Sequence, residues 1–115
     1  MNVVIIRGAL SRAPEARSLP SGDSIAQFEV TVRDPDHPAE SVPVVWFDPP
    51  TSAVRLSPGT EVVVAGRIRR RFFRTPAGTG SRTEVVATRV VPASQAKRAA
   101  TLVAQACSAL ADPAP

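Results

Sequence analysis

Alternating apolar and polar residues predict β-strands over most of the chain before Pro92. An apolar run from Val3 to Leu10 predicts the first strand, which resumes over Ala16–Leu19 after an interruption. Between Ser24 and Arg33 every second residue is apolar, so one face of this strand is expected to point into a core. Three further strands are expected over Ser41–Asp48, Thr60–Arg74 and Arg82–Val91.

The spacing of apolar residues becomes helical near the end of the chain. Between Ser94 and Leu110 it predicts a helix, and a shorter helical segment is expected over Thr51–Ser57. Five strands with a helix between the third and fourth favour a closed barrel, because closure removes exposed sheet edges. The predicted fold class is all-β, a five-stranded OB-fold barrel with a C-terminal α-helix. The expected divisions are the barrel domain over 1–92, the helix over 93–111 and a tail over 112–115.

The strand from Thr60 to Arg74 carries the clearest functional signal. Its alternation divides it into two rows, and the row that includes Val62, Val64, Ile68, Arg70 and Phe72 is expected to face the core. The outward row contains Arg67, Arg69, Arg71 and Phe73. Guanidinium groups neutralise phosphate and an exposed ring can stack on a base, a combination that holds single-stranded nucleic acid. A solvated barrel face or a subunit contact is the alternative interpretation of this row.

Charge and composition support a polyanionic partner. The chain has 115 residues and a net charge of +4, and five of its arginines lie between Arg67 and Arg74. Such clustering sets the local field that a polyanion meets. The single cysteine, Cys107, excludes an internal disulfide and fits a reducing compartment. Because no apolar run reaches the length of a membrane span and no signal peptide is evident, we expect a soluble, cytoplasmic, nucleoid-associated protein.

The pattern of reactive residues argues against catalysis. His37 is the only histidine and lies in a loop, and Cys107 lies on the apolar stripe of the last helix. A metal site or an activated thiol would need further ligands or a neighbouring base. The sequence carries no phosphate-binding loop or dinucleotide fingerprint. We therefore expect no enzymatic activity, no metal and no cofactor.

Several segments, in order and with matching spacing, resemble bacterial single-stranded-DNA-binding proteins. The resemblance covers about residues 1–92 and implies an OB barrel that is commonly a homotetramer. It also implies that aromatic rings stack on bases while basic residues follow the DNA backbone. The segments that carry the resemblance are Asn2–Leu10, Pro14–Arg17, Pro20–Gly22, Pro43–Phe47, Gly59–Ile68 and Thr83–Ala87.

The resemblance assigns roles to particular residues. Phe73 falls at a stacking position in the family's long hairpin, and Phe47 at another stacking position at the end of the third strand. Because adjacent strand residues point to opposite faces, either Trp46 or Phe47 must face the core, and the resemblance favours Phe47 outside. Together with the arginines near Phe73 and before the first turn, the candidate nucleic-acid-binding residues are Arg17, Phe47, Arg67, Arg69, Arg71, Phe73 and Arg74.

The chain also departs from the family pattern. One family tryptophan has no counterpart between the second and third strands, and the position of another is Ser41. An alanine-rich helix that ends with Asp112–Pro115 stands where the family has a flexible tail with an acidic tip that recruits replication and repair proteins. The resemblance therefore implies a divergent paralogue without acidic-tail recruitment.

These observations lead to two functional hypotheses. The first is sequence-independent binding of single-stranded DNA by a homotetramer or homodimer, which protects or organises the strand in replication, recombination or repair. RNA remains an open alternative ligand, because stacking and phosphate contacts serve either nucleic acid. The second is an OB-fold protein-interaction module similar to primosomal accessory proteins, with weak or no DNA binding.

Overall fold

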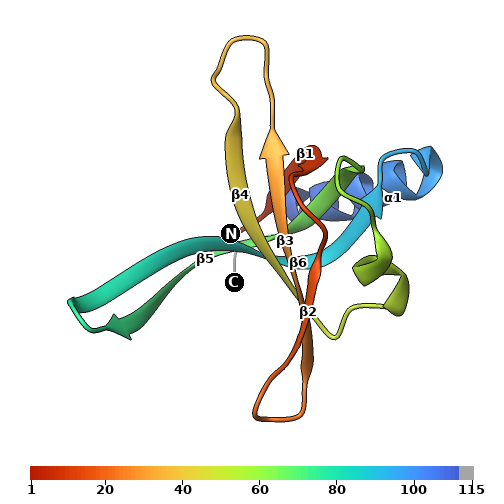
Figure 1. The fold of residues 1–115 in the computed structure, drawn as a ribbon. Coiled ribbons are helices and arrows are strands. Elements are labelled where there is room, and N and C mark those ends of the chain that lie inside the picture. Colours follow the sequence, from red (N-terminus) through yellow and green to blue (C-terminus); the bar gives the residue numbers. More distant parts are fainter. Residues whose placement is uncertain (112–115) are drawn as a thin grey trace.

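A computed structural model of the chain describes residues 1–111 and shows a β-barrel with one C-terminal α-helix (Figure 1). The strand order is β1-β5-β6-β4-β3-β2, and an additional pairing between β1 and β3 closes the ring. The expected OB-fold class is thereby confirmed. The expected tail over 112–115 lies outside the described residues. The strands are β1 (Val4–Leu10), β2 (Glu15–Ser18), β3 (Ser24–Val32), β4 (Glu40–Phe47), β5 (Glu61–Thr75) and β6 (Gly78–Pro92).

The first strand of the five-stranded barrel is built from two pieces. β1 pairs with β5 along most of its length and reaches β3 only at Ala9 and Leu10, whereas β2 pairs with β3 alone. The break falls at the interruption expected before Ala16. Gly8 allows β1 to cross β3, because a Cβ atom at this position would lie 2.4 Å from the backbone oxygen of Thr31. A close approach of two backbones thus closes the barrel.

The barrel core is filled by the inward rows of β3, β4, β5 and β6. Phe28 and Val30 of β3 meet Val44 of β4 and Val64 of β5 in one buried cluster. Trp46 packs against this cluster from β4. A 3₁₀-helix, η1 (Thr51–Arg55), connects β4 to β5 and contributes one buried residue, Ala53.

The C-terminal helix covers the outer side of the barrel. It comprises α1 (Ala96–Ser108) followed by a 3₁₀ turn, η2 (Ala109–Ala111). Leu102 packs with Val63 and Ala65 of β5 and Val91 of β6 in a second buried cluster. Both faces of β5 are therefore buried near its start, which explains the unbroken apolar run from Val62 to Ala65.

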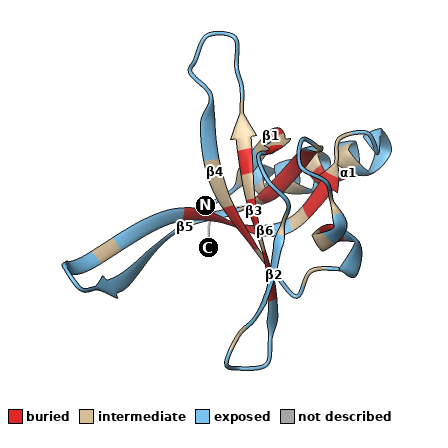
Figure 2. Cartoon of the chain, viewed as in Figure 1, coloured by how far each residue is buried: buried red, intermediate tan, exposed pale blue. Residues whose placement is uncertain are grey.

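β5 and β6 extend beyond the barrel as a long hairpin. Their pairing continues to Thr75 and Gly78, so β6 begins before Arg82, where the sequence predicted it. The turn is shorter than expected because only Pro76 and Ala77 separate the two strands. Figure 2 shows that burial is concentrated in the barrel and that the projecting part of the hairpin is almost wholly exposed.

Leucine truncation should distinguish the packed helix position from an exposed one. Leu102 is 3% exposed and Leu110 is 67% exposed. We expect Leu102→Ala to lower the free energy of unfolding by about 2–5 kcal/mol, because it leaves a cavity between α1 and the sheet. The matched variant Leu110→Ala should change it by less than about 0.5 kcal/mol. Chemical denaturation measures both values, and equal losses would contradict the packing of α1.

Candidate nucleic-acid interface

One shallow groove gathers side chains from five strands on the outer surface of the barrel. Cross-strand pairing places Arg17 of β2 beside Ile25 of β3, and Ile25 beside Phe47 of β4. Arg69 and Arg71 of β5 line the groove from the other side. Four of the candidate residues, Arg17, Phe47, Arg69 and Arg71, are therefore brought together. The full lining is Arg17, Leu19, Ile25, Gln27, Val45, Phe47, Arg69, Arg71 and Glu84.

The two adjacent aromatic residues at the end of β4 point in opposite directions. Phe47 is an exposed side chain and lines the groove, whereas Trp46 packs against the barrel core. This is the orientation expected from the alternation and the resemblance. The ring of Phe47 therefore lies where a base could stack, and that of Trp46 does not.

Glu84 is the residue that the sequence analysis missed at this site. Its side chain is 1% exposed, and its Oε2 accepts hydrogen bonds from Nε and Nη2 of Arg69 at 2.9 and 2.7 Å. The other oxygen lies 3.6 Å from Arg71 Nη2 and 3.9 Å from Arg82 Nε. Arg71 and Arg82 are cross-strand neighbours, an arrangement that would be repulsive without the carboxylate. Glu84 thus orders a cluster that keeps a net positive charge.

A signal for Glu84 was present in the sequence. Glu84 directly precedes the apolar run Val85–Ala87, so an acidic residue there needed a charged partner. The partner could not be named without the register, which pairs Arg69 with Glu84.

Arginine side chains lie over the rings of this face. The Cζ atom of Arg69 is 5.5 Å from the centroid of Phe47, and that of Arg71 is 5.6 Å from the centroid of Phe73. Both distances fall within the range of cation–π interaction. The ring of Phe73 also lies against its cross-strand partner Gly80, where a Cβ atom would approach it to 2.6 Å. Arginine and ring are thus held side by side before any ligand binds.

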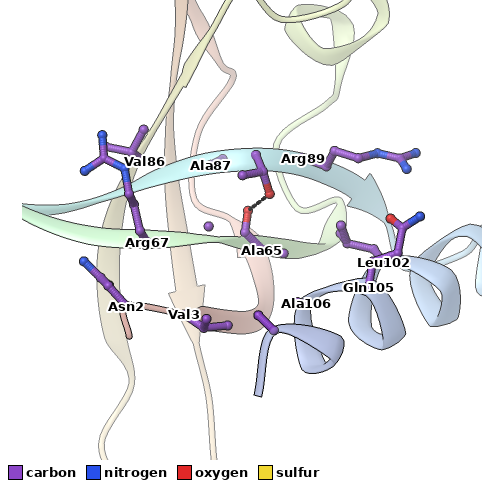
Figure 3. A pocket seen from close by; sticks show the side chains of 13 residues that line it. Asn2, Val3, Ala65, Arg67, Val86, Ala87, Arg89, Leu102, Gln105 and Ala106 are labelled. Carbon is purple, nitrogen blue, oxygen red and sulfur yellow. Dashed lines mark hydrogen bonds between the residues drawn. The ribbon is translucent and has the colours of Figure 1, made fainter. Parts of the chain in front are cut away.

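Three candidate residues do not line the groove: Phe73, which lies on the hairpin beside Arg71, and also Arg67 and Arg74. Arg67 lines a second pocket, between the barrel and α1, together with Asn2, Ala65 and Ala106 (Figure 3). Arg74 is an exposed residue near the turn, opposite Thr79. Strand alternation puts its side chain on the face of the hairpin away from Phe73. The proposed set is therefore split into a groove, a hairpin end and a separate pocket.

The barrel and its groove lie within a recognisable family domain. A model of the single-strand binding protein family matches residues 1–93. The chain belongs to this family. A search of curated proteins found no match. All of the candidate binding residues lie within the single-strand binding family match, and α1 follows it. Family membership supports single-stranded DNA binding as the general activity.

Two structural findings bear on other classes of function. Within residues 1–111, no three histidine, cysteine, aspartate or glutamate side chains are grouped so that they could hold a metal ion. In the same described part of the chain, no helix has the length and apolar character needed to cross a membrane.

Replacing Glu84 by glutamine should show how far this carboxylate stabilises the single-strand binding domain. We expect Glu84→Gln to lower the free energy of unfolding by about 1–3 kcal/mol, because charged hydrogen bonds to Arg69 are weakened at a buried position. The control is Glu29→Gln, whose partner Arg12 lies 3.2 Å away in a largely exposed ion pair. That variant should lose no more than about 1 kcal/mol. Urea denaturation compares the two, and the expectation fails if their losses are equal.

Proposed function

We propose that this protein binds single-stranded DNA without sequence preference and protects or organises it during replication, recombination or repair. The observation that carries the proposal is the arginine–phenylalanine arrangement on one face of a family barrel. Arg69 contacts Phe47, and Arg71 contacts Phe73. Guanidinium groups would hold the phosphates while the rings stack on bases. Every base presents a π-face, so such contacts tolerate any sequence.

Because the proposed contacts combine ionic and stacking interactions, the affinity for single-stranded DNA should depend on salt concentration. Two exposed rings would each contribute about 1–3 kcal/mol per stacked base. Four phosphate contacts would give a slope of about −3 for log affinity against log salt concentration on single strands. Glu84 already occupies donors of Arg69, which reduces what that residue offers a phosphate. The proposed complex is therefore one of moderate affinity that weakens as salt rises.

Other features of this proposal concern assembly and cellular context. We expect a homodimer or homotetramer that acts at the nucleoid in the cytoplasm, with residues 1–92 as the binding domain and 93–111 as an added helix. These features follow from the family resemblance and the sequence.

One structural observation favours the protein-interaction hypothesis. Glu84 neutralises part of the arginine cluster, which would favour a partner less acidic than DNA. A module of the primosomal accessory type would then bind DNA weakly or not at all.

A titration of labelled oligo(dT) separates the two hypotheses. The test variant is Arg69→Ala/Arg71→Ala/Phe73→Ala, and we expect it to weaken binding by about 100-fold or more, because it removes one stacking ring and two phosphate contacts. Fluorescence anisotropy at several salt concentrations measures the affinity and its slope.

The control variant likewise removes two arginine side chains and one large apolar side chain, but outside the groove. Arg55, Arg98 and Leu110 are exposed residues that do not line the groove, so Arg55→Ala/Arg98→Ala/Leu110→Ala should bind almost as well as the wild type. Absence of wild-type binding at low salt would refute DNA binding and favour the interaction module. Undiminished binding by the test variant would refute the proposed site.

A further inference from the structure

The projecting hairpin has a second face that the candidate site does not use. On β5 it is formed by Ile68, Arg70, Phe72 and Arg74, which we call the second face. The sequence pattern predicted that this row would face the core. That prediction is wrong for this part of the strand, because β5 pairs with β1 only as far as Gly66 and its inward row is uncovered beyond that point: Ile68 is 48% exposed and Phe72 is 66% exposed.

The second face repeats the arginine–ring arrangement of the first. The Cζ atom of Arg70 lies 5.5 Å from the centroid of Phe72, matching the 5.6 Å between Arg71 and Phe73 on the opposite face. Arg70 also donates a hydrogen bond through Nη2 to Ser81 Oγ at 3.2 Å. An arginine is thus ordered beside an exposed ring on both sides of one two-stranded ribbon.

The two faces differ in how their positive charge is compensated. Glu84 is the only acidic residue in the sequence between Ile68 and Val85, and it lies on the first face beneath Arg69. The cross-strand partners of Arg70, Phe72 and Arg74 are the uncharged residues Thr83, Ser81 and Thr79. Within residues 1–111 neither Arg70 nor Arg74 forms an ion pair, so the guanidinium groups of the second face are available to an anion.

This chemistry matches single-stranded DNA better than it matches a second copy of the chain. Two hairpins stacked through this face would bring Arg70 and Arg74 of each copy together, which is repulsive. One ring and one isoleucine also offer little apolar area compared with the roughly 1,200 Å² buried in the smaller stable interfaces. A polyanion with stackable bases satisfies both the charges and the ring.

We propose that the second face is an additional contact surface for single-stranded DNA, so that one hairpin holds two segments of the same strand. The inference rests on the proposed function. It adds the consequence that the strand continues from the groove past Phe73 and around the hairpin to Phe72. Phe72 and Arg70 then contribute only when the DNA is long enough to reach both faces.

The test compares variants of the two faces on oligo(dT) of increasing length. Arg70→Ala/Phe72→Ala removes the second face, and the matched variant Arg71→Ala/Phe73→Ala removes the same residue types from the first. The shortest oligonucleotide is about 8 nucleotides, within the site of a single OB fold, and the longest is several times that length. Circular dichroism checks that both variants are folded.

The proposal predicts a length-dependent loss. Arg70→Ala/Phe72→Ala should bind the shortest oligonucleotide as well as the wild type, bind the longest about tenfold more weakly, and cover fewer nucleotides per protomer at saturation. Arg71→Ala/Phe73→Ala should weaken binding at every length. Phe72→Trp, which keeps a stacking ring, should retain wild-type binding of long strands.

Three results would overturn the inference. If the wild type binds and Arg70→Ala/Phe72→Ala matches it in affinity and site size at every length, the second face does not contact DNA. If that variant instead forms a smaller oligomer by light scattering with unchanged DNA binding, the face is a subunit contact. If the wild type binds no oligonucleotide, the proposed function and this inference both fail.

Discussion

The structure depends on the long pairing of β5 with β6, which a single register shift between Ala65 and Gly66 interrupts. The ladder runs from Val62 opposite Pro92 to Thr75 opposite Gly78, so the same two strands form part of the barrel and build the projecting hairpin. Near Val63 the pair is buried on both faces, by the core and by α1. Beyond Gly66 the side chains of β5 become more exposed, although Val86, Val85 and Glu84 of β6 are still buried, and the two strands keep satisfying each other's backbone groups. The hairpin can therefore stand in solvent and present side chains on two sides.

The carboxylate of Glu84 links this framework to the chemistry of the groove. A buried carboxylate needs charged partners, and Arg69, Arg71 and Arg82 supply them. The same contacts hold the guanidinium groups beside Phe47 and Phe73, which in the proposed complex would reduce the conformational entropy lost on binding DNA. Charge neutralisation by Glu84 would also weaken phosphate binding, because a phosphate would have to share Arg69 with Glu84. A preorganised but partly neutralised surface is the result.

Each of the two faces of the hairpin carries one arginine–phenylalanine contact. Strand alternation places Arg70 and Phe72 on one face of the hairpin and Arg71 and Phe73 on the other. On one side the pair continues the barrel groove. On the other it stands alone, without an acidic neighbour on the hairpin. A ribbon built in this way presents an arginine beside an exposed ring on each of its two sides.

The sequence alone was enough to predict the all-β class, the break between β1 and β2, the C-terminal helix, and which residues of β5 share a face. It also indicated that Phe47 and not Trp46 points outward. Most of these features follow from alternation and helical spacing, which are properties of neighbouring residues, whereas the choice of Phe47 over Trp46 came from the family resemblance. Only the tertiary structure decided that the row of Ile68 and Phe72 lies in solvent, that Glu84 sits beneath Arg69, and that Arg67 belongs to a different pocket. Those outcomes depend on where the barrel ends and on the register between β5 and β6, and both are set by contacts between residues far apart in the chain.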